Sequence, residues 1–145
     1  MARAENRITI NKPVATVFDF ILDGANNRLW RSSVIDVTPL TGKPYGVGSA
    51  FQQGLKGPGG RIDGDYKIIE CKPNIFIQFE VTAGPARPTG MYRFEPEGQG
   101  TRVTFTLDFQ PKGLAKLMEP MINQSMKSEV AMLSNLKTYL EEQMS

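Results

Sequence analysis

The chain has 145 residues with 17 basic and 15 acidic side chains, and it contains no histidine. A chain of this length forms one domain, residues 1–145, which is large enough to bury a core and to hold a cavity within it. The missing histidine excludes Ser-His-Asp and Cys-His nucleophiles and zinc sites with imidazole ligands, and the scattered basic side chains argue against a nucleic-acid partner.

The N-terminal part of the chain predicts one strand and two short helices. Residues 7–11 alternate polar and apolar side chains, as in a half-buried strand. Pro13 then opens a short helix, since proline suits the first helical turn, and the helix ends at Asp23. A second short helix is expected over residues 26–31, centred on Trp30.

The middle of the chain predicts six consecutive antiparallel strands. They cover residues 34–39, 46–56, 61–71, 74–83, 88–96 and 101–110. Stretches rich in glycine, proline and asparagine separate them and supply tight turns. The last strand alternates most clearly, with Val103, Phe105 and Leu107 on one face and polar residues on the other. Such a strand has one dry face and one wet face.

The C-terminal part predicts one long helix over residues 113–144, because the hydrophobic period changes to that of an α-helix. One apolar arc of this helix contains Leu114, Met118, Ile122, Met132, Leu133, Leu136 and Leu140. Pro120 lies inside the helix and should kink it or split off its first turns.

Glu129 lies near the middle of this apolar arc, with Ser125 one turn earlier. A carboxylate in such a place needs a partner or a water-filled space. One interpretation pairs Glu129 with a strand arginine, and the other makes it a polar anchor inside a cavity. Arg61 and Arg93 are conceivable partners, but strand alternation places both on wet faces, which favours water or a ligand.

Five motifs follow one another along nearly the whole chain. They are Ile8-x-Ile10-x2-Pro13-x3-Val17-Phe18; Asp23-x2-Asn26-x3-Trp30; Gly46-x-Gly48-Ser49; Gly90-x-Tyr92-x-Phe94-x-Pro96 with Gly100-Thr101-x-Val103; and Leu133-x2-Leu136-Lys137-x2-Leu140-Glu141. In their order and spacing the chain resembles the SRPBCC superfamily, which includes START-like lipid carriers, pollen-allergen-like proteins and the bacterial polyketide cyclase/dehydrase group.

The resemblance implies an α+β helix-grip fold. In this fold a curved seven-stranded antiparallel sheet wraps around a long C-terminal helix, and two short helices lie between strands 1 and 2. The resemblance also implies a deep apolar cavity between sheet and helix. The predicted elements agree, since a curled sheet that faces one helix leaves a gap for side chains or a ligand.

The leading hypothesis for the function is binding, with transport or sequestration, of a small hydrophobic ligand such as a lipid, an isoprenoid or an aromatic polyketide. We expect the cavity wall to contain Trp30, Phe51, Gln53, Tyr66, Phe79, Tyr92, Met118, Met121, Ile122, Ser125 and Glu129. The alternative is an enzyme of the polyketide cyclase/dehydrase type that uses the same cavity, for which no catalytic residue can be named. A further alternative is a protein-interaction module.

Cysteine content and hydropathy lead to expectations about location and partners. The single cysteine, Cys71, cannot form an internal disulfide or a thiolate metal site. The N-terminal residues lack the apolar stretch of a signal peptide, and the longest apolar run, residues 130–133, is too short to span a membrane. We therefore expect a cytoplasmic protein with no metal, no cofactor and no stable membrane insertion, either a monomer or a homodimer.

Overall fold

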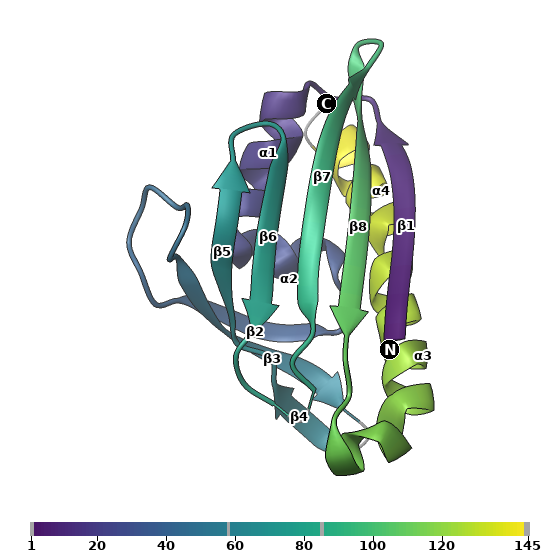
Figure 1. The fold of residues 1–145 in the computed structure, drawn as a ribbon. Helices are drawn as coiled ribbons and strands as arrows, with labels where there is room; N and C mark the ends of the chain where they lie inside the picture. Colours follow the sequence, from purple (N-terminus) through teal and green to yellow (C-terminus); the bar gives the residue numbers. More distant parts are fainter. Residues whose placement is uncertain (1, 58, 85, 144–145) are drawn as a thin grey trace.

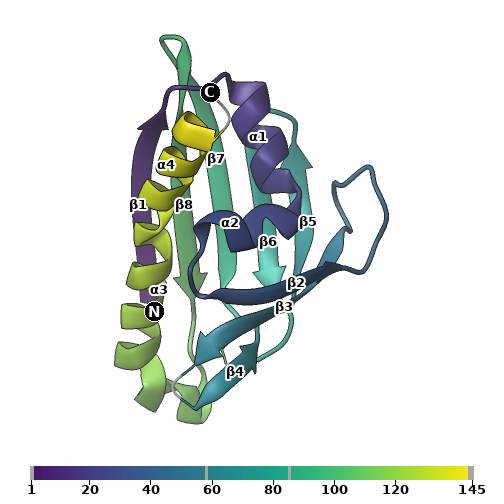
Figure 2. The same ribbon diagram turned by 180° about the vertical axis from the view of Figure 1, so that it is seen from behind.

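In the computed structural model, an antiparallel sheet curls around helices that cover its concave face (Figures 1 and 2). The structure describes residues 2–57, 59–84 and 86–143. The strands are β1 (Ala2–Ile10), β2 (Val34–Pro39), β3 (Ala50–Gly57), β4 (Gly60–Asp63), β5 (Tyr66–Lys72), β6 (Phe76–Val81), β7 (Thr89–Glu97) and β8 (Gly100–Phe109). The helices are α1 (Val14–Leu22), η1 (Gly24–Asn26), α2 (Asn27–Trp30), η2 (Gly113–Met118), α3 (Glu119–Ala131) and α4 (Leu133–Gln143).

The sheet has the strand order β1-β8-β7-β6-β5-β3-β2, and every neighbouring pair along this path is antiparallel. The short strand β4 lies off this path and pairs with β3. The predicted helix-grip fold is thereby confirmed: seven strands form the curled sheet, and α1 and α2 lie between its first two strands in sequence.

The strand predicted over residues 61–71 is divided into β4 and β5 by a corner at Gly64 and Asp65. The backbone N–H of Gly64 donates to the carbonyl of Gln53, and the carboxylate of Asp65 accepts from the N–H of Gln53. A Cβ atom at Gly64 would lie 2.6 Å from Cδ1 of Leu55. A larger residue at Gly64 would therefore require the side chain of Leu55 to shift. The corner lets β3 pair with both β4 and β5.

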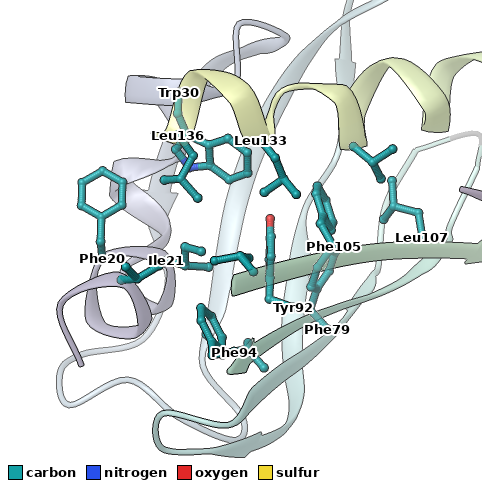
Figure 3. Close-up of a cluster of buried hydrophobic side chains, with 14 of the residues drawn as sticks. Phe20, Ile21, Trp30, Phe79, Tyr92, Phe94, Phe105, Leu107, Leu133 and Leu136 are labelled. Atoms are coloured by element: carbon teal, nitrogen blue, oxygen red, sulfur yellow. The ribbon is translucent and has the colours of Figure 1, made fainter. Parts of the chain in front are cut away.

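The core lies between the concave face of the sheet and the helices (Figure 3). Tyr92 and Phe105 stack with ring centroids 4.4 Å apart, and Trp30 meets both rings edge-on at 6.3 Å. Leu133 and Leu136 of α4 are fully buried above these rings. Burying a side chain of this size stabilises the fold by about 1.5–3 kcal/mol, so α4 is firmly attached to the sheet.

The C-terminal helix is broken twice. The expected effect of Pro120 is confirmed: η2 is split off as a separate 3₁₀ segment, and Pro120 lies in the first turn of α3, where its missing N–H costs nothing. A second break, which we did not predict, lies at Met132, where its N–H donates to the carbonyl of Glu129. The side chain of Asn135 donates to the carbonyl of Trp30 and attaches the start of α4 to α2.

These breaks change which residues of the predicted apolar arc face the core. Ile122, Met126 and Val130 of α3 are buried, whereas Met118, in the 3₁₀ segment, is exposed. The side chain of Leu114 lies outside the described residues. No helix among the described residues is long and apolar enough to cross a membrane.

Candidate functional site

An apolar cavity of about 150 Å³ lies between α3 and the concave face of the sheet. Its floor contains Phe79 of β6 with Phe105 and Leu107 of β8, and Ile122 and Met126 of α3 form one wall. An apolar cavity of roughly 150 Å³ can hold benzene. The cavity therefore has room for about one aromatic ring as it stands.

The opposite wall comes from the β3–β4 hairpin, which contributes Leu55 and Ile62. The exposed residues that line the cavity are Lys56 and Asp63 of the hairpin and Ser125 of α3. These three residues mark the mouth, while the buried aromatic residues lie deeper. A ligand would thus enter between the hairpin and α3.

Two opposite charges meet inside this cavity. Arg31, which directly follows α2, donates from Nε and Nη2 to the same oxygen of Glu129, Oε1, at 3.1 Å and 2.5 Å. The two side chains are only 10% and 14% exposed. The N–H of Arg31 bonds to the carbonyl of Asn27, and its carbonyl accepts from the N–H of Val34, which places Arg31 between α2 and β2.

The pairing determines the charge state of Arg31. Burial alone lowers the pKa of its guanidinium, but the charge and hydrogen bonds of Glu129 raise that pKa above its ordinary value. Arg31 therefore stays positive, and Glu129 balances it. Because both hydrogen bonds use Oε1, the second carboxylate oxygen, Oε2, accepts no hydrogen bond from the described residues.

A second cluster of polar side chains contains the hydroxyl of Tyr66. The side-chain amide of Asn27 donates to Oε1 of Gln53 at 2.9 Å and to the hydroxyl oxygen of Tyr66 at 3.0 Å. Desolvation by burial raises the pKa of Tyr66 well above its usual value, so the hydroxyl keeps its proton. Tyr66 accepts from Asn27 and can still donate to a group in the cavity.

A smaller cavity of about 20 Å³ adjoins the first, since Arg31, Tyr66 and Phe79 line both. Tyr92 lines only the smaller one, and its hydroxyl forms no hydrogen bond with a described residue. Burial raises the pKa of Tyr92 to about 12. The positive charge of Arg31 lowers this pKa, and the negative charge of Glu129 raises it. Figure 3 shows this hydroxyl pointing from the sheet toward the helices.

The structure brings most of the sequence-predicted site residues together. The large cavity is lined by Gln53, Tyr66, Phe79, Ile122, Ser125 and Glu129, and Tyr92 lines the small one. Trp30 and Phe51 are buried in the core and line neither cavity. Met118 and Met121 also line neither and are exposed. The break at Pro120 ends the helical period that had placed Met118 with Ile122, whereas Met121 lies in α3 beside the buried Ile122 and on a different side of the helix.

The main residue that sequence reasoning missed is Arg31. We expected water or a ligand beside Glu129, whereas the structure places Arg31 there; the two positions are 98 residues apart, and no periodic pattern connects them. The placement of the two candidate arginines on wet faces was correct. Arg61 pairs with Asp36 and Asp63 on the surface, and Arg93 is exposed.

Comparison with known proteins identifies the family. Residues 1–141 match the model of the family described as polyketide cyclase / dehydrase and lipid transport. The chain belongs to this family. No curated protein sequence matches the chain, so the remaining comparisons are with solved structures.

Several solved structures share the fold of this polyketide cyclase / dehydrase and lipid transport domain. A START superfamily protein from Mycobacterium smegmatis has a TM-score of 0.82 and 13% identity, with 100% of each chain covered. The Zhui aromatase/cyclase from Streptomyces sp. R1128 has a TM-score of 0.81 and 14% identity, with 99% of this chain and 95% of that chain covered. A protein from Thermus thermophilus has a TM-score of 0.82 and 18% identity, with 99% of each chain covered.

Proposed function

We propose that the protein binds a small hydrophobic molecule, such as a lipid, an isoprenoid or an aromatic polyketide, and transports or sequesters it. The observation that carries this proposal is the apolar cavity between α3 and the sheet, with its floor of buried aromatic side chains. Apolar walls with a few convergent polar groups are typical of small-molecule sites. The family description, which includes lipid transport, supports the same function.

The wall of the cavity suits ligands of different shapes. Met126 contributes an unbranched, flexible side chain that repacks easily. A ligand larger than one ring would require α3 to move away from the β3–β4 hairpin. The breaks at Pro120 and Met132 leave α3 as a separate segment between two turns, so such a movement need not carry α4 with it. We propose the cytoplasm as the location, since the sole cysteine, Cys71, has no internal partner.

Two serines of α3 provide a matched test. Both Ser125 and Ser128 are exposed, but only Ser125 lines the cavity. We expect Ser125→Trp to weaken binding of ethylbenzene and of N-phenyl-1-naphthylamine by at least about tenfold, because the indole fills the mouth. Ser128→Trp should leave both affinities unchanged. Absence of binding to the wild-type protein, or equal effects of the two variants, would contradict the proposed site.

A second candidate function is catalysis of the polyketide cyclase type, which the polar groups of the same cavity favour. Ring closure by an aldol reaction requires a base that removes a proton next to a carbonyl and a donor that stabilises the resulting enolate oxygen. Oε2 of Glu129 would accept the proton, and Arg31 or the hydroxyl of Tyr66 would donate to the oxygen. The Zhui aromatase/cyclase shows that this fold occurs in such a protein.

The two functions predict different behaviour of a molecule that is purified with the protein. Native mass spectrometry of protein from its own host would reveal a bound species. A carrier releases that species unchanged, whereas an enzyme converts a precursor of it. If Glu129→Gln abolishes conversion but preserves binding, catalysis is supported; if no conversion occurs with any bound species, carriage remains as the function.

A further inference from the structure

Given the proposed ligand-binding function, on which this assignment rests, we infer that the ligand is neutral and carries a hydroxyl group on an apolar ring. The ring occupies the large cavity, and the hydroxyl is directed at Arg31 and Tyr92, where the large and small cavities adjoin. The polar end of the ligand is then a hydroxyl group, and carboxylates such as fatty acids are excluded.

The charges inside the cavity are already balanced. Arg31 gives two hydrogen bonds to Oε1 of Glu129, and Oε2 accepts none from the described residues. A carboxylate near Arg31 would meet the negative charge of Glu129, and like charges repel strongly where water is scarce. A neutral group that donates a hydrogen bond to Oε2 meets no such repulsion.

The hydroxyl of Tyr92 forms no hydrogen bond with a described residue, and Tyr92 lines the small cavity. A polar group that lines a cavity can form a hydrogen bond with a molecule bound there. Arg31 lies beside Tyr92 in the wall of the small cavity. A ligand oxygen placed there accepts from Tyr92 or from Arg31, and its own proton is available to Glu129.

The sizes of the two cavities agree with this arrangement. The small cavity, about 20 Å³, has room for about one water molecule, and a hydroxyl oxygen is of that size. A carboxylate has two oxygens and is too large for it. The large cavity is lined mainly by apolar side chains such as Phe79 and Leu107, which suits a ring without further polar groups.

Three molecules that share a ring and an ethyl group test the inference on the wild-type protein: 4-ethylphenol, ethylbenzene and 4-ethylbenzoate. Near pH 7, where the phenol is neutral and the benzoate is charged, isothermal titration calorimetry gives the three affinities. We expect 4-ethylphenol to bind about tenfold more tightly than ethylbenzene, and 4-ethylbenzoate to bind most weakly. Equal affinities for 4-ethylphenol and ethylbenzene, or tightest binding of 4-ethylbenzoate, would overturn the inference.

The same series separates this inference from the proposed function. If none of the three molecules binds, including ethylbenzene, the ligand-binding function itself is wrong. If ethylbenzene binds but the hydroxyl adds nothing, the cavity binds ligands and only the hydroxyl assignment is wrong.

Two variants test whether the hydroxyl of 4-ethylphenol lies beside Tyr92. Tyr92→Phe should weaken 4-ethylphenol binding by about tenfold and leave ethylbenzene unchanged, since it removes only a hydroxyl without a partner among the described residues. The control is Tyr139→Phe, because Tyr139 packs on Phe20 and lines neither cavity. Equal effects of these two variants on 4-ethylphenol would overturn the assignment.

Glu129→Gln tests the charge argument, since the amide still accepts from Arg31 but is neutral. We expect the affinity for 4-ethylbenzoate to rise by about tenfold relative to that for 4-ethylphenol. Thermal unfolding of each variant shows that the fold is retained. An unchanged ratio of the two affinities in a folded Glu129→Gln protein would overturn the charge argument.

Discussion

Arg31 and Glu129 connect the end of α2 to α3 through two hydrogen bonds to a single carboxylate oxygen, across 98 residues of sequence. The pair lies in the wall of the cavity rather than on the surface. A buried ion pair adds little to stability when compared with apolar side chains of the same size, but each partner depends on the other. The pair is therefore informative about both stability and ligand preference.

Glu129→Leu should destabilise the protein by about 3–5 kcal/mol, because it leaves the buried guanidinium of Arg31 without a counter-charge. The double variant Arg31→Leu with Glu129→Leu should recover most of this loss, since neither charge remains buried. Urea unfolding of the wild type, both single variants and the double variant gives the coupling energy. Equal stabilities of Glu129→Leu and the wild type would mean that water solvates the charge of Arg31 in the variant.

Alkaline pH should destabilise the protein through Tyr92. Its pKa is raised to about 12 in the folded protein, against about 10 in the unfolded chain, because burial disfavours the phenolate. Protonated Tyr92 makes its full contribution to the free energy of unfolding below pH 10. That contribution is lost as the pH rises toward 12, at about 1.4 kcal/mol per pH unit. Urea unfolding between these pH values should show a shallower loss for Tyr92→Phe than for the wild type, and identical slopes would contradict the assignment.

The packing of α4 against the sheet can be tested at Leu136, which is fully buried. Leu136→Asp should unfold the domain, since an unpaired carboxylate would replace a core side chain at a cost of more than about 4 kcal/mol. Ser134→Asp lies on the exposed side of the same helix and should leave the melting temperature nearly unchanged. Circular dichroism during heating distinguishes the two, and a folded Leu136→Asp protein would exclude this packing.

Gly90 of β7 supports the floor of the cavity. A Cβ atom at this position would lie 2.2 Å from Cζ of Phe79, so the buried ring must move. We expect Gly90→Ala to cost about 1–3 kcal/mol and to weaken ethylbenzene binding, as in other overpacked cores. Gly59→Ala is the control, because a Cβ there meets nothing within 4 Å. Calorimetry and thermal unfolding of the two variants measure both effects.

Local periodicity was sufficient to predict most of the architecture. The alternation in β8 placed Val103, Phe105 and Leu107 on the buried face, as observed. Proline disrupts the interior of a helix but suits its first turn, and Pro120 accordingly lies in the first turn of α3. These features depend on residues that are neighbours in sequence, so the amino-acid pattern alone determines them.

The candidate site depends on features that periodicity does not contain. The helical wheel placed Glu129 on the apolar side of the C-terminal helix, but its partner Arg31 lies in a different element. A wheel also assumes an unbroken helix, so it placed Met118 in line with Ile122, whereas the break at Pro120 leaves Met118 exposed in η2. Which side chains meet across a cavity is decided only when the curled sheet brings α2 and α3 together, because packing joins residues that no local pattern relates.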